Sequence, residues 1–152
     1  MKKLLLWLII FSVAVTAHSQ PLPDSVIAKY KAAKTDKEKG TCLMNYFKKQ
    51  ILTDAKTKAD ILLLKTWFAK QNDEASKNYT NLELALILET NSDYPAALDL
   101  LFSELPQFES RKDTLGIERT YSIIGTTYMA AKDYNNAAEY EKKRNCSRRG
   151  TE

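Results

Sequence analysis

Residues 84–97 read Leu-Ala-Leu-Ile-Leu-Glu-Thr-Asn-Ser-Asp-Tyr-Pro-Ala-Ala, and residues 124–137 read Ile-Gly-Thr-Thr-Tyr-Met-Ala-Ala-Lys-Asp-Tyr-Asn-Asn-Ala. Agreement between stretches at one fixed offset is typical of a repeat architecture. The chain is therefore predicted to build one helix–turn–helix unit twice. At one constant offset the two stretches agree in residue type or class at Leu84 and Ile124, Ala85 and Gly125, Leu88 and Tyr128, Asp93 and Asp133, Tyr94 and Tyr134, and Ala97 and Ala137.

The residue types that recur fit the needs of two antiparallel helices. A small residue is expected where the helices cross, namely Ala85 or Gly125 on the first helix and Ala97 or Ala137 on the second. The Asp-Tyr pair falls between the two helices, where the aspartate can cap the new helix and the tyrosine can pack back on the pair. One such pair cannot bury its apolar face alone, so further pairs are expected to stack on it.

Apolar residues outside the two stretches also follow helical spacing, and only 4 Gly and 4 Pro interrupt them. The expected fold is all-α, with antiparallel helix pairs stacked as a short α-solenoid after a signal peptide. Pro106 is expected to end one helix at Leu105, and a stretched linker over 107–113 is expected to produce the long period. Helices are expected over 24–34, from Asp36, from Asp54 or Ala55, from Ser76, over 94–105, over 114–131, and from Tyr134 onward.

This pattern resembles the tetratricopeptide repeat, whose signature has an aromatic, a Leu-Gly pair, a Tyr and then an Ala at fixed spacing. The resemblance covers 78–140 clearly and 24–77 in outline. It implies a degenerate helical repeat region over 20–77 and two tetratricopeptide-like repeats over 78–143. The best match is carried by Tyr121, Ile124, Gly125, Tyr128 and Ala137. A looser one over 81–106 is carried by Leu84, Ala85, Leu88, Ala97, Leu101 and Pro106, with Asn81 departing at the aromatic position.

A leader, a degenerate helical start and long-period repeats entered by Lys-Asp-Thr-Leu-Gly-Ile (112–117) occur together. The combination is similar to the N-terminal extracytoplasmic region of Bacteroidetes-type tetratricopeptide sensor histidine kinases. In that family a membrane helix and a cytoplasmic output module follow the repeats. The resemblance implies a role in signal transduction.

Residues 1–19 have the features of a signal peptide. Lys2 and Lys3 precede an apolar run over 4–15, and Ala-His-Ser at 17–19 is a small-x-small cleavage site. Cleavage between Ser19 and Gln20 would release the mature chain. An apolar run of about a dozen residues is shorter than the roughly 20 that a membrane span needs. The protein is therefore expected to be exported, to the periplasm in a diderm bacterium, with an uncleaved anchor or a buried helix as the alternative.

The formal net charge of +4 is concentrated at the two ends of the chain. Residues 141–152 carry a net +3 and the leader carries +2, so residues 20–140 are close to neutral at −1. A nucleic-acid-binding surface needs clustered Lys and Arg. No such cluster is seen in the body of the chain, so a nucleic-acid partner is not expected.

The end of the chain departs from the repeat pattern. Glu141 occupies a position where the family has a large apolar residue, and Tyr140 lies one position early. Residues 144–152 are expected to form an irregular basic tail, either because the gene is truncated or frame-shifted or because the terminus is frayed. The last pair should then close poorly, leaving Ile124 and Tyr128 partly uncovered, and such a surface would favour self-association.

The residue inventory argues against catalysis. The one histidine, His18, lies in the leader, so the mature chain lacks the usual general base and the usual zinc ligand. Cys42 and Cys146 fit no metal spacing. They could pair in an oxidising compartment, but a free, buried Cys42 is favoured. No Gly-rich phosphate loop is present, and Trp67, Phe68, Tyr121 and Tyr128 are expected in the core. Catalytic, cofactor and metal sites are therefore not expected.

Three functions remain open. The first is an exported interaction module without catalytic activity, whose helical groove binds a protein or peptide. The second is the truncated input region of a two-component histidine kinase or a similar signalling protein. The third is a secreted carrier with a small-molecule pocket between its helices.

Overall fold

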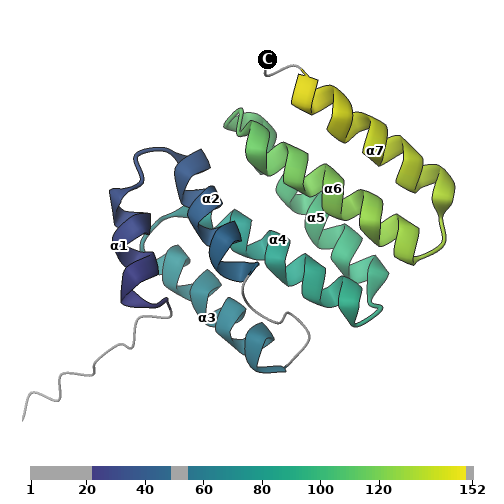
Figure 1. Ribbon diagram of the computed structural model, residues 1–152. Helices are drawn as coiled ribbons and strands as arrows, with labels where there is room; N and C mark the ends of the chain where they lie inside the picture. Colours follow the sequence, from purple (N-terminus) through teal and green to yellow (C-terminus); the bar gives the residue numbers. More distant parts are fainter. Residues whose placement is uncertain (1–21, 49–54, 150–152) are drawn as a thin grey trace, which may run out of the picture.

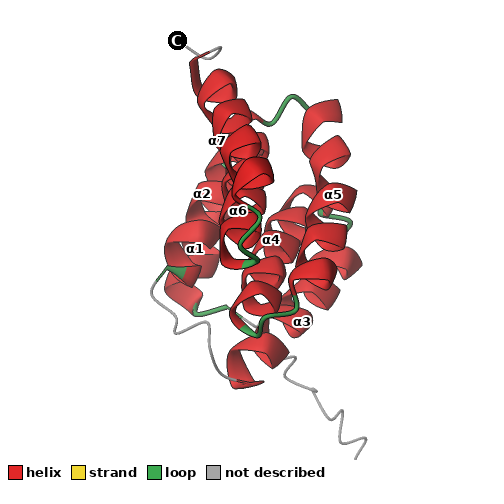
Figure 2. Ribbon diagram, turned by 90° about the vertical axis from the view of Figure 1, so that its right-hand side faces the viewer, coloured by secondary structure: helices red, strands yellow, loops and turns green. Residues whose placement is uncertain are grey.

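The computed structural model describes residues 22–48 and 55–149, and within these ranges it is all-α, as predicted. The signal peptide and its Ser19–Gln20 junction lie outside the described residues. Figure 1 places α1 and α2 at one end of the molecule and α7 at the other, and Figure 2 shows the short turns between the helices. The described helices are α1 (Asp24–Ala32), α2 (Asp36–Phe47), α3 (Ala55–Lys70), α4 (Glu74–Thr90), α5 (Tyr94–Ser110), α6 (Thr114–Ala130) and α7 (Tyr134–Arg149).

Each helix packs against the next one along the chain from α3 onward, and α1 packs against α2. Among the described residues, contacts between helices that are not chain neighbours join α2, α4 and α6. The helix α4 therefore lies at the centre, and ten of its side chains are buried. Large side chains such as Tyr79, Leu82 and Ile87 form the core there, with Phe68 from α3 and Leu101 and Phe108 from α5.

One turn, repeated four times, fixes the alternation of helix directions. Asn72, Ser92, Lys112 and Lys132 follow one another at a constant interval, and all adopt positive φ, between 54° and 63°. The next residue is in every case an aspartate, and its N–H donates to the carbonyl five residues back, as from Asp113 to Phe108 at 2.9 Å. This is the Schellman ending of a helix.

The same aspartates begin the following helices. Asp73, Asp93, Asp113 and Asp133 each accept a hydrogen bond from the backbone N–H three residues later, as an N-cap does. One residue therefore serves as the end of one helix and the start of the next. The helices α4, α5 and α6 have 17 residues each, and it is their length, with short turns between them, that produces the long period of the repeat.

Replacing Lys132 by glycine is expected to stabilise the fold by about 1 kcal/mol, because an L-residue at positive φ is strained and glycine is not. Urea unfolding measures this change. The matched control is Lys142→Gly, which lies inside α7 and is expected to cost about 1 kcal/mol. Equal effects at the two positions would contradict the role given to positive φ.

Two expectations about α5 are wrong. The helix does not stop at Pro106 but runs to Ser110, so the stretched linker over 107–113 does not exist. Proline removes one backbone hydrogen bond from a helix interior. The helix nevertheless continues because Leu101, Glu104 and Phe108 keep one face buried past the proline. The long period therefore comes from long helices and not from a long linker.

The expected irregular tail is also wrong for residues 144–149, which belong to α7. Arg144 Nη1 donates to Ser122 Oγ at 3.5 Å, and Arg148 lies 4.0 Å from the Glu118 carboxylate. These contacts tie the last turns of α7 to α6. Other boundaries differ slightly: α4 begins at Glu74 rather than Ser76, and α1 ends at Ala32 rather than Lys34.

The last helix pair closes better than expected. Ile124 is fully buried, and Tyr128 is half-buried. Tyr140 covers part of this pair, because its ring stacks on Tyr128 at 5.7 Å and also lies 5.9 Å from Phe102 and 6.1 Å from Tyr121. The position after Tyr140 holds Glu141, so Tyr140 supplies the bulk that the pattern lacks there.

Candidate interaction surface

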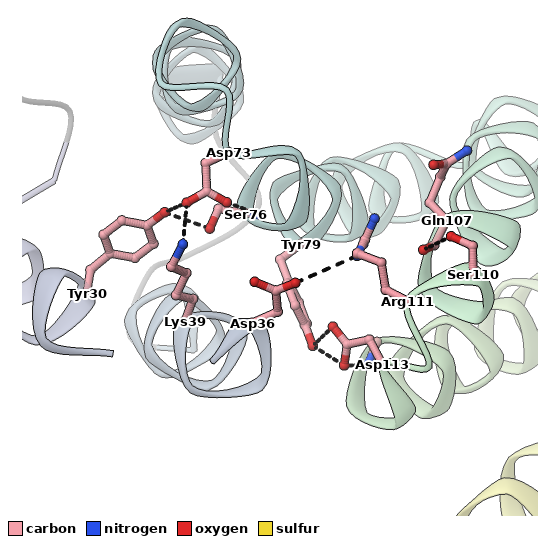
Figure 3. A network of polar contacts seen from close by, with 11 residues as sticks. Tyr30, Asp36, Lys39, Asp73, Ser76, Tyr79, Gln107, Ser110, Arg111 and Asp113 are labelled. Carbon is pink, nitrogen blue, oxygen red and sulfur yellow. Dashed lines mark hydrogen bonds and ion pairs between the residues drawn. The ribbon is translucent and has the colours of Figure 1, made fainter. Parts of the chain in front are cut away.

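A network of polar contacts joins α1, α2 and α4 (Figure 3). The Tyr30 hydroxyl donates to Asp73 and lies 2.8 Å from Ser76 Oγ, while Lys39 Nζ donates to Asp73 Oδ2 at 2.9 Å. Burial alone would raise the pKa of Asp73. The hydrogen bonds from Tyr30, Lys39 and the Ser76 backbone N–H outweigh burial and lower that pKa. Asp73 is therefore held as a carboxylate.

A second tyrosine–aspartate contact joins α4 to the start of α6. The Tyr79 hydroxyl lies 2.9 Å from both carboxylate oxygens of Asp113, and burial followed by the Asp113 charge raises the pKa of Tyr79. The Tyr79 ring faces Gly40 of α2 and lies 5.1 Å from the ring of Phe108. Tyr79 therefore contacts α2, α5 and the α6 cap at once, which explains why α2, α4 and α6 meet.

The variant Tyr79→Phe is expected to lose about 2 kcal/mol in the free energy of unfolding, because the buried Asp113 carboxylate loses its phenol donor. Chemical denaturation gives the value. Tyr134→Phe is the matched control. The Tyr134 ring is 62% exposed, so removing its hydroxyl should have no measurable effect on stability. An unchanged stability of Tyr79→Phe would contradict the assignment.

A buried polar pair lies between α4 and α5. Asn81 Nδ2 donates to Glu104 Oε1 at 2.6 Å, yet Asn81 Oδ1 and Glu104 Oε2 have no hydrogen-bond partner among the described residues. Burial raises the pKa of Glu104, although Asn81, Lys65, Lys77 and Arg111 all oppose the rise. A proton on Oε2 would supply the donor that the Asn81 oxygen lacks.

The variant Glu104→Gln is expected to raise stability at pH 7 by about 1 kcal/mol, because an amide keeps the hydrogen bond and can donate to Asn81 without burying a charge. A raised folded-state pKa means that the folded protein binds more protons. The contribution of Glu104 is therefore largest below the unfolded value of about 4.3 and is lost as pH rises through the folded value.

The gain from Glu104→Gln should accordingly grow as pH rises from 4 towards neutral. Thermal or urea unfolding across this range measures it. Asp99→Asn, on an exposed position of the same helix, is the matched control for an acid-to-amide change. A gain independent of pH would show that Glu104 does not titrate in this window.

A groove of about 620 Å³ runs between α1 and α2. Its volume lies in the range of ligand-binding clefts. Val26, Cys42 and Tyr46 lie half-buried on its floor and pack against the core. The remaining lining residues are Lys29, Ala32, Ala33, Lys34, Glu38, Thr41 and Asn45.

The repeat-signature residues lie mainly inside the helix pairs. Gly125 faces the backbone of Ala137, and a Cβ added to it would lie 3.7 Å from the Ala137 carbonyl oxygen, so the crossing has room for alanine. The Tyr134 ring is 62% exposed, so the expectation that this tyrosine packs back on its pair is wrong. Ala85, Ala97, Ile124, Gly125 and Ala137 are buried, whereas Leu84, Leu88, Tyr94, Tyr121 and Tyr128 are half-buried.

The remaining candidate residues are placed as follows. Phe68 is fully buried, and Trp67 is half-buried with its ring 5.0 Å from that of Phe68. Cys42 and Cys146 are both free thiols; Cys42 is half-buried, and its Sγ lies 3.7 Å from the Val26 carbonyl oxygen, while Cys146 is exposed. Burial raises the pKa of the Cys42 thiol, although the nearby Lys29 ammonium opposes the rise.

Two kinds of feature are absent from the described residues. No group of three His, Cys, Asp or Glu side chains is arranged to hold a metal ion there. In the same ranges, no helix combines the length and the apolar character required to cross a bilayer.

Comparison with known proteins identifies no family. No family model, no curated protein and no solved structure matches the chain. The functional interpretation therefore depends on the geometry and the sequence.

Proposed function

We propose that this chain is an exported protein–protein interaction module of the tetratricopeptide type, a short α-solenoid without catalytic activity. The observation that carries the proposal is the repeated unit of one long helix and one short turn, with a positive-φ residue and an aspartate cap recurring at a constant interval. Units of this kind stack through neighbour contacts and expose extended surfaces, which helical-repeat proteins use to bind other chains.

Two features favour binding over chemistry. The only histidine of the sequence lies in the leader, so the mature chain would lack the commonest general base. Several polar side chains already have partners within the fold, since the half-buried Asp73 and the buried Asp113 cap helices and the buried Glu83 pairs with Arg119. The open groove between α1 and α2 is the recess best suited to receive part of a partner.

Selection of a peptide display library on the immobilised chain from Gln20 onward tests the proposal. Enriched peptides are expected to bind the free protein in solution, saturably and at one-to-one stoichiometry, in isothermal titration calorimetry. The same selection on the chain carrying Gly40→Trp, which disrupts the contact with Tyr79, should not enrich them. Failure to enrich any peptide that binds in solution would overturn the proposed function.

Export is tested separately with residues 1–30 fused to a phosphatase that is active only outside the cytoplasm. Phosphatase activity is expected, and mass spectrometry of the processed fusion should find Gln20 as its first residue. Replacing Lys2 and Lys3 by glutamate should lower export. An inactive fusion that keeps its leader would contradict export without touching the binding proposal.

A further inference from the structure

The groove between α1 and α2 is built from one continuous face of each helix. On α2 the lining residues Glu38, Thr41, Cys42, Asn45 and Tyr46 follow at steps of three, one, three and one. This is the spacing of a single helical face over two turns, a length of about 12 Å. A straight groove of this length matches about two turns of a partner helix.

Small side chains along part of the groove leave room for a helix to approach. Ala32 and Ala33 at the C-terminal end of α1 and Thr41 and Cys42 of α2 all line the groove. Small residues let the backbone of a third helix approach closely, while Val26 and Tyr46 offer apolar surface on the groove floor. An extended peptide would find no free strand edge, because the described residues form helices here.

The net charge around the groove indicates the charge of the partner that it would bind. Residues 24–48 contain six lysines and three acidic residues, a net charge of +3, although residues 20–140 together carry −1. Lys29 and Lys34 are exposed on the groove and form no ion pair within the described ranges. The Glu38 carboxylate is already engaged, because it accepts from the backbone N–H groups of Lys34 and Thr35.

We propose that this groove binds an acidic amphipathic helix of a partner protein. The apolar face of that helix lies on Val26, Cys42 and Tyr46, and its flanking carboxylates pair with Lys29 and Lys34. This is the helix-in-groove mode of recognition, with electrostatic complementarity selecting the partner. The inference rests on the proposed function and specifies its partner.

The probe is a fluorescein-labelled helical peptide with leucines at i, i+3, i+4 and i+7 and glutamates on both flanks. It is titrated by fluorescence anisotropy against the chain from Gln20 onward carrying Cys146→Ser, so that Cys42 is the only thiol. A peptide with lysines in place of the glutamates is the matched control. Saturable binding of the glutamate peptide, and binding of the lysine peptide weaker by about tenfold or more, are expected.

Two variants and one chemical readout locate the binding. Lys29→Glu with Lys34→Glu is expected to weaken binding about tenfold or more, whereas Lys58→Glu with Lys70→Glu, an equal charge change on α3, should not. Bound peptide should also slow the reaction of Cys42 with a thiol reagent in proportion to occupancy. Circular dichroism of each variant checks that it remains folded.

Binding that neither protects Cys42 nor responds to Lys29→Glu with Lys34→Glu would overturn the groove assignment and leave the interaction module standing. Equal binding of the glutamate and lysine peptides would overturn the acidic chemistry of the partner. Absence of binding by the glutamate peptide, together with library peptides that do bind, would overturn this inference alone. A failure of both the probe and the library would overturn the proposed function as well.

Discussion

Replacing Gly116 by alanine is expected to destabilise the protein by about 2 kcal/mol, although alanine is the better helix former by about 1 kcal/mol. A Cβ at this position would lie 2.5 Å from Phe108 Cγ and closer still to two other carbons of that ring. The Phe108 ring cannot move aside to make room for the added Cβ. It is fully buried, it contacts Tyr79, and the Arg111 guanidinium lies 5.3 Å from its centroid.

Gly125→Ala is the matched control and should have the opposite sign. The nearest atom to its added Cβ lies 3.7 Å away, so the substitution gains helix propensity without a clash, about 1 kcal/mol of stabilisation. Urea unfolding of the two variants should therefore differ by about 3 kcal/mol. Replacing the Phe108 ring by the smaller leucine side chain should recover part of the loss in Gly116→Ala. Equal effects of the two glycine substitutions would contradict the packing described here.

Removing the Arg119 charge is expected to have the second large effect. Arg119 Nη2 on α6 lies 3.6 Å from Glu83 Oε1 on α4, and the Glu83 side chain is only 3% exposed. A buried carboxylate that loses its cation typically costs about 3 kcal/mol or more. The variant Arg119→Met should lose about that much at pH 7, because it keeps the bulk of the side chain and removes the charge.

The loss should depend on pH in a defined direction. Burial raises the pKa of Glu83 and the Arg119 charge opposes that rise, so Arg119→Met should raise the pKa further. A raised folded-state pKa means that stability falls as pH rises above the unfolded value of about 4.3. The difference between Arg119→Met and the parent protein should therefore be smallest near pH 4 and largest at neutral pH.

Two further variants isolate this pair. Glu83→Gln combined with Arg119→Met should recover most of the stability, because no buried charge remains. Arg148→Met removes an arginine whose side chain is 70% exposed and 4.0 Å from Glu118, so its cost should not exceed about 1 kcal/mol. A pH-independent loss in Arg119→Met would mean that packing, and not charge, makes this contact matter.

The helices could be predicted from the sequence, but the turns between them could not. Helical spacing of apolar residues identifies long buried helices such as α4 and α6 reliably. The aspartates at 73, 93, 113 and 133 recur at a constant interval and were a visible signal of the cap. The positive-φ residue before each aspartate could not be recognised as such. At three of the four positions it is Ser92, Lys112 or Lys132, which are not residue types that favour that conformation.

The errors at α5 and α7 have separate physical causes. Propensity places a helix end at Pro106, but the burial of Phe108 beyond it decides the outcome. Among the described helices α7 packs mainly on α6, so one narrow apolar stripe is enough, and that stripe consists mainly of Ala137 and Tyr140. So little apolar content produces no detectable periodicity, although the Lys and Arg residues that follow are good helix formers.

The candidate site was the least predictable part of the molecule. Tyr79 of α4 meets Asp113 at the start of α6, and Tyr30 of α1 meets Asp73 at the start of α4. Nothing local in the sequence connects such pairs, because they exist only once α2, α4 and α6 are stacked. The same holds for Gly40, which packs against the ring of Tyr79, a residue far from it in the sequence.

The short turn constrains which insertions and deletions the gene can tolerate. Each helix residue advances the chain by about 100° around its axis, so one inserted residue inside α4 or α6 would rotate every later side chain away from its buried face. Loss or gain of a single helix with its turn would reverse the direction of all following helices. A change by one whole helix pair restores both rotation and direction, and duplication of α4 with α5 as one block would lengthen the array while leaving every existing contact type available.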